Sequence, residues 1–198
     1  MPRAEFFEKL GLFVARDFFD GQTCADLCAE MRSAQSSQSY IIRDGIEMVD
    51  RGSRSTKDVK ISKATRALVK ERLVSVKPQI EKHFALRLDD CEPPSFLLYR
   101  EGDFFRQHKD KHESNSTLNR QVSVVIFLNS ANEGSDAYSY CGGHLTLFGL
   151  VNDECWRNYG FPLVGETGLM IAFRSDTVHE VKSVTRGERQ TIVSWYIN

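Results

Sequence analysis

From Leu88 onward the chain is a succession of short apolar runs, separated by turns rich in Gly, Asn, Asp and Ser. Many short strands at near-regular spacing, coming after helical segments, are typical of antiparallel folds built from two packed sheets. The sequence therefore predicts a mainly β protein, a jelly-roll or barrel with N-terminal helices packed on one sheet. The predicted strands cover residues 95–100, 104–110, 121–128, 144–148, 167–173, 179–184 and 190–197.

Ahead of this region, a short aromatic run at 11–19 predicts a first strand. Thr23 and Asp26 have the spacing of a capping box, which predicts a helix from there to about Ser33. A polar loop is expected over 33–39.

A second helix is predicted from Lys63, because apolar residues recur there at helical spacing with Lys and Arg between them. Pro78 is expected to kink or split this helix, since proline lacks the N–H that bonds back one turn. The apolar positions are Val69, Leu73, Val76, Ile80 and Phe84.

Residues 40–61 mix short β-leaning pieces with glycines and charged side chains. The segment is interpreted as a surface hairpin. Two interpretations stay open here: a mobile lid over a site, and a solvated edge hairpin.

Length and composition limit the function classes. At 198 residues the chain is expected to form one domain, with the first strand, the helices and the lid segment in 1–94 and the β core in 95–198. Its 26 basic and 27 acidic residues give a net charge of −1, which argues against nucleic acid as a partner. No long apolar run occurs near the N-terminus, so neither a signal peptide nor a membrane span is expected.

The five cysteines are expected to be reduced thiols in a cytoplasmic protein, because their number is odd and no secretory signal is evident. Two of them belong to a helical stripe that is expected to face the core. The stripe consists of Cys24, Leu27, Cys28 and Met31.

Residues 96–110 contain the pattern that points to chemistry. They predict a strand, a turn at 101–103 and a second strand that ends in His108-Lys109-Asp110. Side chains at i and i+2 share a face of a strand, so an imidazole and a carboxylate would point the same way. His-x-Asp alone is weak evidence, because a chain with this many histidines and acidic residues contains roughly 0.7 His-x-Asp or His-x-Glu tripeptides by chance.

A third ligand is therefore needed, and His179 is the preferred one because it opens a strand directly after a short turn. His112 is interpreted as a solvated residue at the strand exit, and His144 as a weaker competitor that lacks a partner set. Two histidines and one carboxylate form the facial triad of non-haem ferrous oxygenases. Zinc hydrolases use the same residue types, so both chemistries stay open at this point.

Arg189 favours the oxygenase. It follows the hairpin after His179 and starts a strand face shared with Thr191, Val193 and Trp195. Its guanidinium is too distant to bind the metal, but it could hold the far carboxylate of an extended diacid by two hydrogen bonds. Tyr99 offers a hydroxyl for the same carboxylate, whereas a hydrolase has no evident use for such a group.

With these residues the chain resembles the Fe(II)- and 2-oxoglutarate-dependent dioxygenases of the prolyl 4-hydroxylase type. The resemblance covers about residues 95–198. Its elements are Tyr99-x-x-Gly102-x5-His108-x-Asp110, Gly142-Gly143-x-Leu145, His179-Glu180-Val181, Arg189 and Trp195.

The resemblance implies a double-stranded β-helix of the jelly-roll, cupin-like type, with Fe(II) held by His108, Asp110 and His179. It implies that Tyr99 and Arg189 bind the C5 carboxylate of 2-oxoglutarate. The co-substrates would be 2-oxoglutarate, decarboxylated to succinate, and O2, with ascorbate as an auxiliary reductant.

The resemblance also implies hydroxylation of a C–H bond, and the preferred substrate is a prolyl residue in a peptide or protein. Trp195 would line the substrate pocket, and Arg54, in the lid segment, is a tentative substrate contact. Three alternatives stay open: a hydroxylase of a free amino acid or small metabolite, a zinc hydrolase, and a metal-free binding module.

Overall fold

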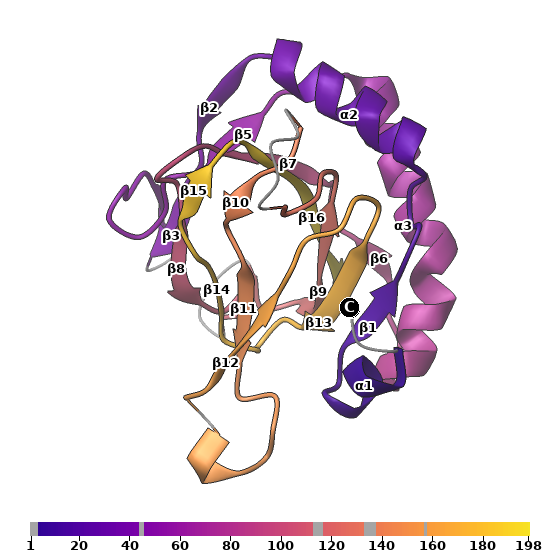
Figure 1. Cartoon of the computed structure of the whole chain (residues 1–198). Helices are drawn as coiled ribbons and strands as arrows, with labels where there is room; N and C mark the ends of the chain where they lie inside the picture. Colours follow the sequence, from indigo (N-terminus) through magenta and orange to yellow (C-terminus); the bar gives the residue numbers. More distant parts are fainter. Residues whose placement is uncertain (1–3, 44–45, 113–116, 133–137, 157) are drawn as a thin grey trace.

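Two antiparallel sheets face each other in the computed structural model, which describes residues 4–43, 46–112, 117–132, 138–156 and 158–198 (Figure 1). This arrangement is the expected double-stranded β-helix. The major sheet has the order β1 (Phe13–Ala15), β13 (Met170–Arg174), β9 (Arg120–Phe127), β16 (Arg189–Ile197), β7 (Ser95–Tyr99), β5 (Lys57–Val59) and β2 (Ser36–Gln38), with β6 (Asp90–Cys91) paired to β16. The second sheet has the order β12 (Gly160–Leu163), β11 (Leu145–Phe148), β14 (His179–Val181) and β8 (Phe105–His108), beside a separate pair of β10 (Cys141–Gly142) and β15 (Val184–Arg186).

The alternation of side chains along the central strands divides the interior into two cores. On β9, one face contributes Val122, Val124 and Ile126 to the core beneath the helices. The other face places Val125 and Phe127 in the core between the two sheets. Because neighbouring residues of a strand point to opposite faces, one apolar strand serves both cores.

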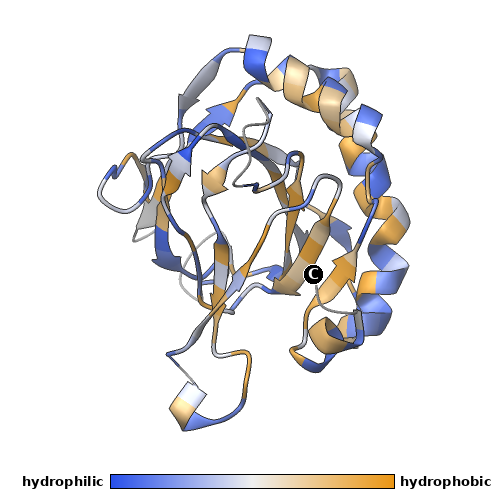
Figure 2. Ribbon diagram, viewed as in Figure 1, coloured by the Kyte–Doolittle hydropathy of each residue, from blue (hydrophilic) through white to orange (hydrophobic). Residues whose placement is uncertain are grey.

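Two long helices, α2 (Gly21–Ser33) and α3 (Lys63–Phe84), cover the outer face of the major sheet (Figure 1). Hydrophobic and hydrophilic residues alternate along both, as a helix with one buried face requires (Figure 2). The predicted stripes of both helices are buried, and these helices are the N-terminal helices expected on one sheet.

The helix ends differ from the sequence-based expectation in two respects. Asp20, rather than Thr23, is the N-cap of α2, and its carboxylate accepts a hydrogen bond from the Thr23 backbone N–H at 2.7 Å. Pro78 lies within α3 and does not split it. The cost of proline is confined to one lost hydrogen bond, while the apolar stripe keeps the helix packed on either side of it.

Some elements were not predicted. A short helix, α1 (Ala4–Lys9), precedes β1, and β1 itself is shorter than the apolar run at 11–19. The polar segment expected as a loop over 33–39 contains β2, an edge strand that needs only backbone pairing to β5. Strand β12 was also missed, and a short 3₁₀ helix, η1 (Glu154–Trp156), lies on the long arm between β11 and β12 (Figure 1).

The segment 40–61 is not one hairpin. Strands β3 (Ile41–Arg43) and β4 (Ile46–Met48) pair with each other apart from both sheets. Strand β5 belongs to the major sheet, where it pairs with β7 and β2. A lid can therefore include the β3–β4 hairpin but not the end of the segment, and residues 44–45 lie outside the described part of the chain.

The five cysteines are free thiols, three of them buried. Among the described residues, no helix has the length and apolar character needed to cross a membrane.

Candidate metal centre

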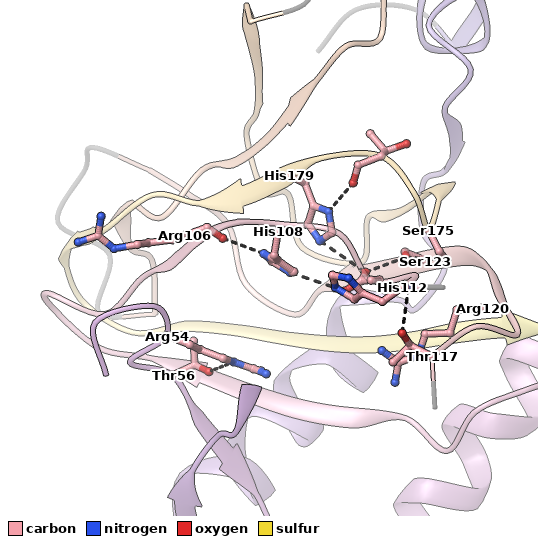
Figure 3. Close-up of polar contacts among 12 residues, drawn as sticks. Arg54, Thr56, Arg106, His108, His112, Thr117, Arg120, Ser123, Ser175 and His179 are labelled. Atoms are coloured by element: carbon pink, nitrogen blue, oxygen red, sulfur yellow. Dashed lines mark hydrogen bonds and ion pairs between the residues drawn. The ribbon is translucent and has the colours of Figure 1, made fainter. Parts of the chain in front are cut away.

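His108 and His179, 71 positions apart along the chain, are brought side by side by strand register. His108 ends β8, His179 begins β14, and the two residues are direct partners in the antiparallel pairing. Their ring centroids are 4.1 Å apart. Non-local pairing of two short strands therefore creates the first half of the site (Figure 3).

Asp110 completes the cluster from a bend that follows β8. The predicted strand to 110 is too long, because β8 ends at His108. The bend is held by Ser175, whose carbonyl accepts hydrogen bonds from the backbone N–H groups of Asp110 and Lys111, both at 2.9 Å. The candidate ligand atoms of Asp110, His108 and His179 lie within 4.8 Å of one another, the one such group found among the described residues.

Both imidazoles present Nε2 to the carboxylate. Nδ1 of His108 lies 2.8 Å from the Arg106 carbonyl oxygen, and Nδ1 of His179 lies 2.9 Å from that of Thr177 (Figure 3). A carbonyl can only accept, so Nδ1 carries a proton in both residues and Nε2 is the nitrogen that faces the carboxylate. The two Nε2 atoms lie 3.6 and 3.4 Å from the oxygens of Asp110.

Aromatic packing fixes the orientation of the two imidazoles. Phe105 stacks on His108 with ring centroids 3.5 Å apart, and Phe173 meets His179 edge-on at 4.8 Å. Burial, reinforced by repulsion from His108, lowers the pKa of His179 to about 4. His179 is therefore neutral at pH 7, the state in which imidazole binds a metal.

Asp110 is ionised. Burial alone would raise its pKa, but His179, His108 and the Trp195 indole together lower the pKa below its usual value. Its Oδ2 also accepts a hydrogen bond of 2.7 Å from the hydroxyl of Ser123, on β9 (Figure 3). Oδ1, the other oxygen, lies 3.6 Å from Nε2 of His108.

The cluster opens into a cavity of about 650 Å³ between the sheets. Every other residue of β16 from its first position, namely Arg189, Thr191, Val193 and Trp195, lines this cavity, as the strand periodicity predicted. Tyr99 and Arg54 also line it.

Arg189 is buried, with 1% of its surface exposed. Its guanidinium carbon lies 4.7 Å from the ring centre of Tyr99 and 5.1 Å from that of Phe127. Nη1 donates to Thr191 Oγ1 at 3.2 Å, and Nε has no acceptor. No carboxylate of the described residues pairs with this buried cation, which is unusual because an unpaired buried charge is costly.

The two tentative substrate contacts are held in different ways. Arg54 donates from Nε to Thr56 Oγ1 at 2.7 Å (Figure 3). Its guanidinium also lies over the Phe105 ring. Trp195 is covered by the guanidinium of Arg120, at 3.6 Å, which in turn makes two hydrogen bonds of 2.6 and 2.7 Å to Glu92.

The two competing histidines lie outside the cluster. His112 is exposed after the bend, as expected. His144 is half-buried just before β11 and belongs to no group of metal-ligating side chains among the described residues.

Three polar residues of the site were missed from the sequence: Ser123, Ser175 and Tyr140. The hydroxyls of Ser123 and Ser175 lie 3.0 Å apart, and both side chains are buried. Tyr140 is fully buried beside Arg189, and its hydroxyl has no hydrogen-bond acceptor among the described residues. Ser123 could have been noticed because it interrupts the apolar run 122–128 with a polar side chain. No local sequence pattern identifies Ser175 or Tyr140 as residues of interest.

Comparison with known proteins agrees with this geometry. The sequence profile described as "2OG-Fe(II) oxygenase superfamily" matches residues 94–197. A PKHD-type hydroxylase of Cupriavidus metallidurans is 32% identical over 108 residues, which is 52% of this chain and 42% of that protein. The chain thus spans less than half the length of the curated relatives it matches.

Two solved structures share the fold. A Pseudomonas putida prolyl-4-hydroxylase has a TM-score of 0.72 at 21% identity, with 98% of this chain and 96% of that chain covered. A Trichoplax adhaerens prolyl hydroxylase, in complex with a hypoxia inducible factor oxygen degradation domain peptide fragment, has a TM-score of 0.72 at 18% identity. The structural match covers 98% of this chain and 86% of the Trichoplax adhaerens chain.

Proposed function

The chain belongs to the 2-oxoglutarate- and Fe(II)-dependent oxygenase superfamily, and from this premise we propose that His108, Asp110 and His179 hold its iron. Two imidazoles with Nε2 directed inward and one ionised carboxylate are a suitable donor set for Fe(II). A metal held by these three donors would still have room to bind 2-oxoglutarate and O2.

The observation that carries the proposal is the unpaired, buried guanidinium of Arg189 in the cavity that also contains the triad. Arginine cannot lose its proton in a protein, so it needs an anion from outside the chain. The C5 carboxylate of 2-oxoglutarate, at the opposite end of the molecule from its metal-chelating atoms, fits this requirement. Neither a zinc hydrolase nor a metal-free binding module has a use for such a cation.

When bound, Fe(II), 2-oxoglutarate and O2 supply the oxidising chemistry that hydroxylates a C–H bond. The protein contributes position and exclusion of water. The triad and Arg189 line the same cavity, so together they would hold 2-oxoglutarate at both ends and fix its orientation. Tyr99, whose ring centre lies 4.7 Å from the guanidinium carbon, is the second proposed contact of the co-substrate.

For the substrate we propose a prolyl residue in a peptide or protein. The support is the similarity in fold to prolyl hydroxylases, one of them in complex with a peptide fragment. Trp195 and Arg54 would contact the substrate, and the β3–β4 hairpin would close over it. Ile41 and Glu47 of that hairpin line the cavity.

The test starts with anaerobic protein and Fe(II). Calorimetry is expected to detect 2-oxoglutarate binding that depends on the metal and is lost in His179→Ala. Succinate formation in air is then measured with a peptide library and, separately, with a panel of amino acids and metabolites. Stimulation by proline-containing peptides supports the proposed substrate, whereas stimulation by metabolites alone identifies a small-molecule hydroxylase.

Two results would contradict the dioxygenase proposal. Protein that binds zinc tightly and does not bind 2-oxoglutarate would be a hydrolase candidate. Protein that binds no metal would be a non-enzymatic β-helix module.

A further inference from the structure

Beside Arg189 lies a second buried donor without an acceptor. Tyr140 has 0% of its surface exposed, and its hydroxyl makes no hydrogen bond of normal geometry. A buried hydroxyl whose hydrogen has no acceptor destabilises the folded state. Such groups are rare in folded proteins and call for a specific explanation.

Tyr140 and Arg189 are neighbours. A Cβ placed on Gly143 would touch both side chains, at 3.0 Å from Cδ of Arg189 and 3.4 Å from the Tyr140 ring. Burial raises the pKa of Tyr140, and the nearby Arg189 guanidinium opposes that increase. The phenol is therefore neutral at pH 7 and keeps its hydrogen for donation.

The position of Tyr140 is fixed by the backbone on either side. Its N–H donates to the Ser130 carbonyl at 3.3 Å, and its own carbonyl accepts from the Asn132 N–H at 2.9 Å. The hydroxyl occupies space that exists because residue 165 is glycine; a Cβ there would collide with it. The orphaned hydroxyl is therefore held in place by its surroundings.

Arg189 and Tyr140 together have more hydrogen-bond donors than acceptors. Nε of Arg189 can only donate, and the Tyr140 hydroxyl can donate once and accept. If Nε donates to the Tyr140 oxygen, the phenolic hydrogen still has no acceptor. A carboxylate supplies acceptor sites for both donors, with a geometry that suits guanidinium.

We propose that the Tyr140 hydroxyl is a donor to the C5 carboxylate of 2-oxoglutarate and, with Arg189, selects a dicarboxylate over a monocarboxylate co-substrate. This inference rests on the proposed function and deepens it. It adds to the co-substrate site a residue outside the motifs of the sequence, on the connection that leads into β10.

The test compares two buried tyrosines by calorimetry on protein loaded with Mn(II), which keeps the site inactive. Tyr140→Phe is titrated with 2-oxoglutarate and with 2-oxopentanoate, a probe of the same length that lacks the distal carboxylate. The matched control is Tyr196→Phe, because the Tyr196 hydroxyl is equally buried but donates to the Leu73 carbonyl at 2.7 Å.

Tyr140→Phe is expected to weaken 2-oxoglutarate binding by about tenfold, the equivalent of one hydrogen bond to a charged group, and to leave 2-oxopentanoate binding unchanged. Its melting temperature without ligand is expected to equal or exceed that of the wild type, because an unsatisfied group is removed. Tyr196→Phe is expected to melt earlier and to bind 2-oxoglutarate normally.

The outcomes separate this inference from the proposed function. Wild-type protein that fails to bind 2-oxoglutarate overturns both. Wild-type protein that binds it, with Tyr140→Phe binding equally well, overturns the role of Tyr140 alone. Equal weakening of both ligands in Tyr140→Phe also overturns it, since the hydroxyl would then serve the shape of the pocket and not the carboxylate.

Discussion

Replacing Ser123 with alanine tests the idea that the β9 strand prepares Asp110 for the metal. The Ser123 hydroxyl lies 2.7 Å from Asp110 Oδ2 and 3.0 Å from the Ser175 hydroxyl, and it has one hydrogen to donate. The shorter contact, to an ionised acceptor, is the stronger hydrogen bond, so that hydrogen goes to the carboxylate. The substitution removes this donor.

The expected magnitude follows from burial and charge. Ser123 is 1% exposed, so water cannot replace the lost donor. A hydrogen bond to a charged group contributes about 1.5–3 kcal/mol, which corresponds to roughly 10- to 100-fold in a binding constant. Groups that orient a metal ligand typically change metal affinity by about the same factor. We therefore expect Ser123→Ala to raise the metal dissociation constant by about 10- to 100-fold.

The assay is calorimetric titration with Mn(II) or, anaerobically, with Fe(II). Ser123→Thr keeps a hydroxyl and is expected to restore most of the affinity. Ser194→Ala is the matched control, because Ser194 is also buried but donates to the Glu92 carbonyl at 2.8 Å, away from the triad. Ser123→Ala protein that is folded and binds metal within about twofold of the wild type would refute the orienting role.

Other consequences can be measured in the same protein. Replacing the hairpin residues 41–48 with a short Gly-Ser link is expected to reduce substrate turnover by about tenfold or more while 2-oxoglutarate affinity is retained; equal loss of both would disprove a lid. Arg189→Lys is expected to weaken 2-oxoglutarate binding by about tenfold in calorimetry, because an ammonium cannot form two parallel hydrogen bonds with a carboxylate; unchanged affinity would place the carboxylate elsewhere. Iodoacetamide at pH 8 is expected to label the exposed Cys155 well before Cys28, whose pKa burial raises to about 12, as followed by peptide mass spectrometry; the opposite order would contradict the packing of α2.

The fold was largely predictable because its strands and helices bury apolar faces with a regular period. The apolar stripe of α3 and the cavity-facing side of β16 can both be predicted from the spacing of residues along the sequence. Strand β2 could not be found in this way. Its residues are polar, and it is a strand only because the backbone of β5 lies beside it.

The same distinction applies to the site. His108 and Asp110 are close in sequence, and His179 opens a strand after a turn, so their meeting could be inferred without coordinates. The position of Asp110 nevertheless depends on a bend held by Ser175, and not on strand alternation as predicted. Ser175 follows β13 and Ser123 lies in β9, and no local pattern states that these strands are neighbours.

The features that prepare the site for an anion also have a cost in stability. The unpaired guanidinium of Arg189 and the unsatisfied hydroxyl of Tyr140 lie in the interior, where each lowers the free energy of unfolding. The stacking of Arg189 between the Tyr99 and Phe127 rings offsets part of that cost, because cation–π contacts strengthen when they are desolvated. A chain selected for stability alone would place an apolar side chain at either position. The Nε of Arg189 and the hydroxyl of Tyr140 are both buried donors without an acceptor among the described residues, and the proposed carboxylate ligand would supply an acceptor for each.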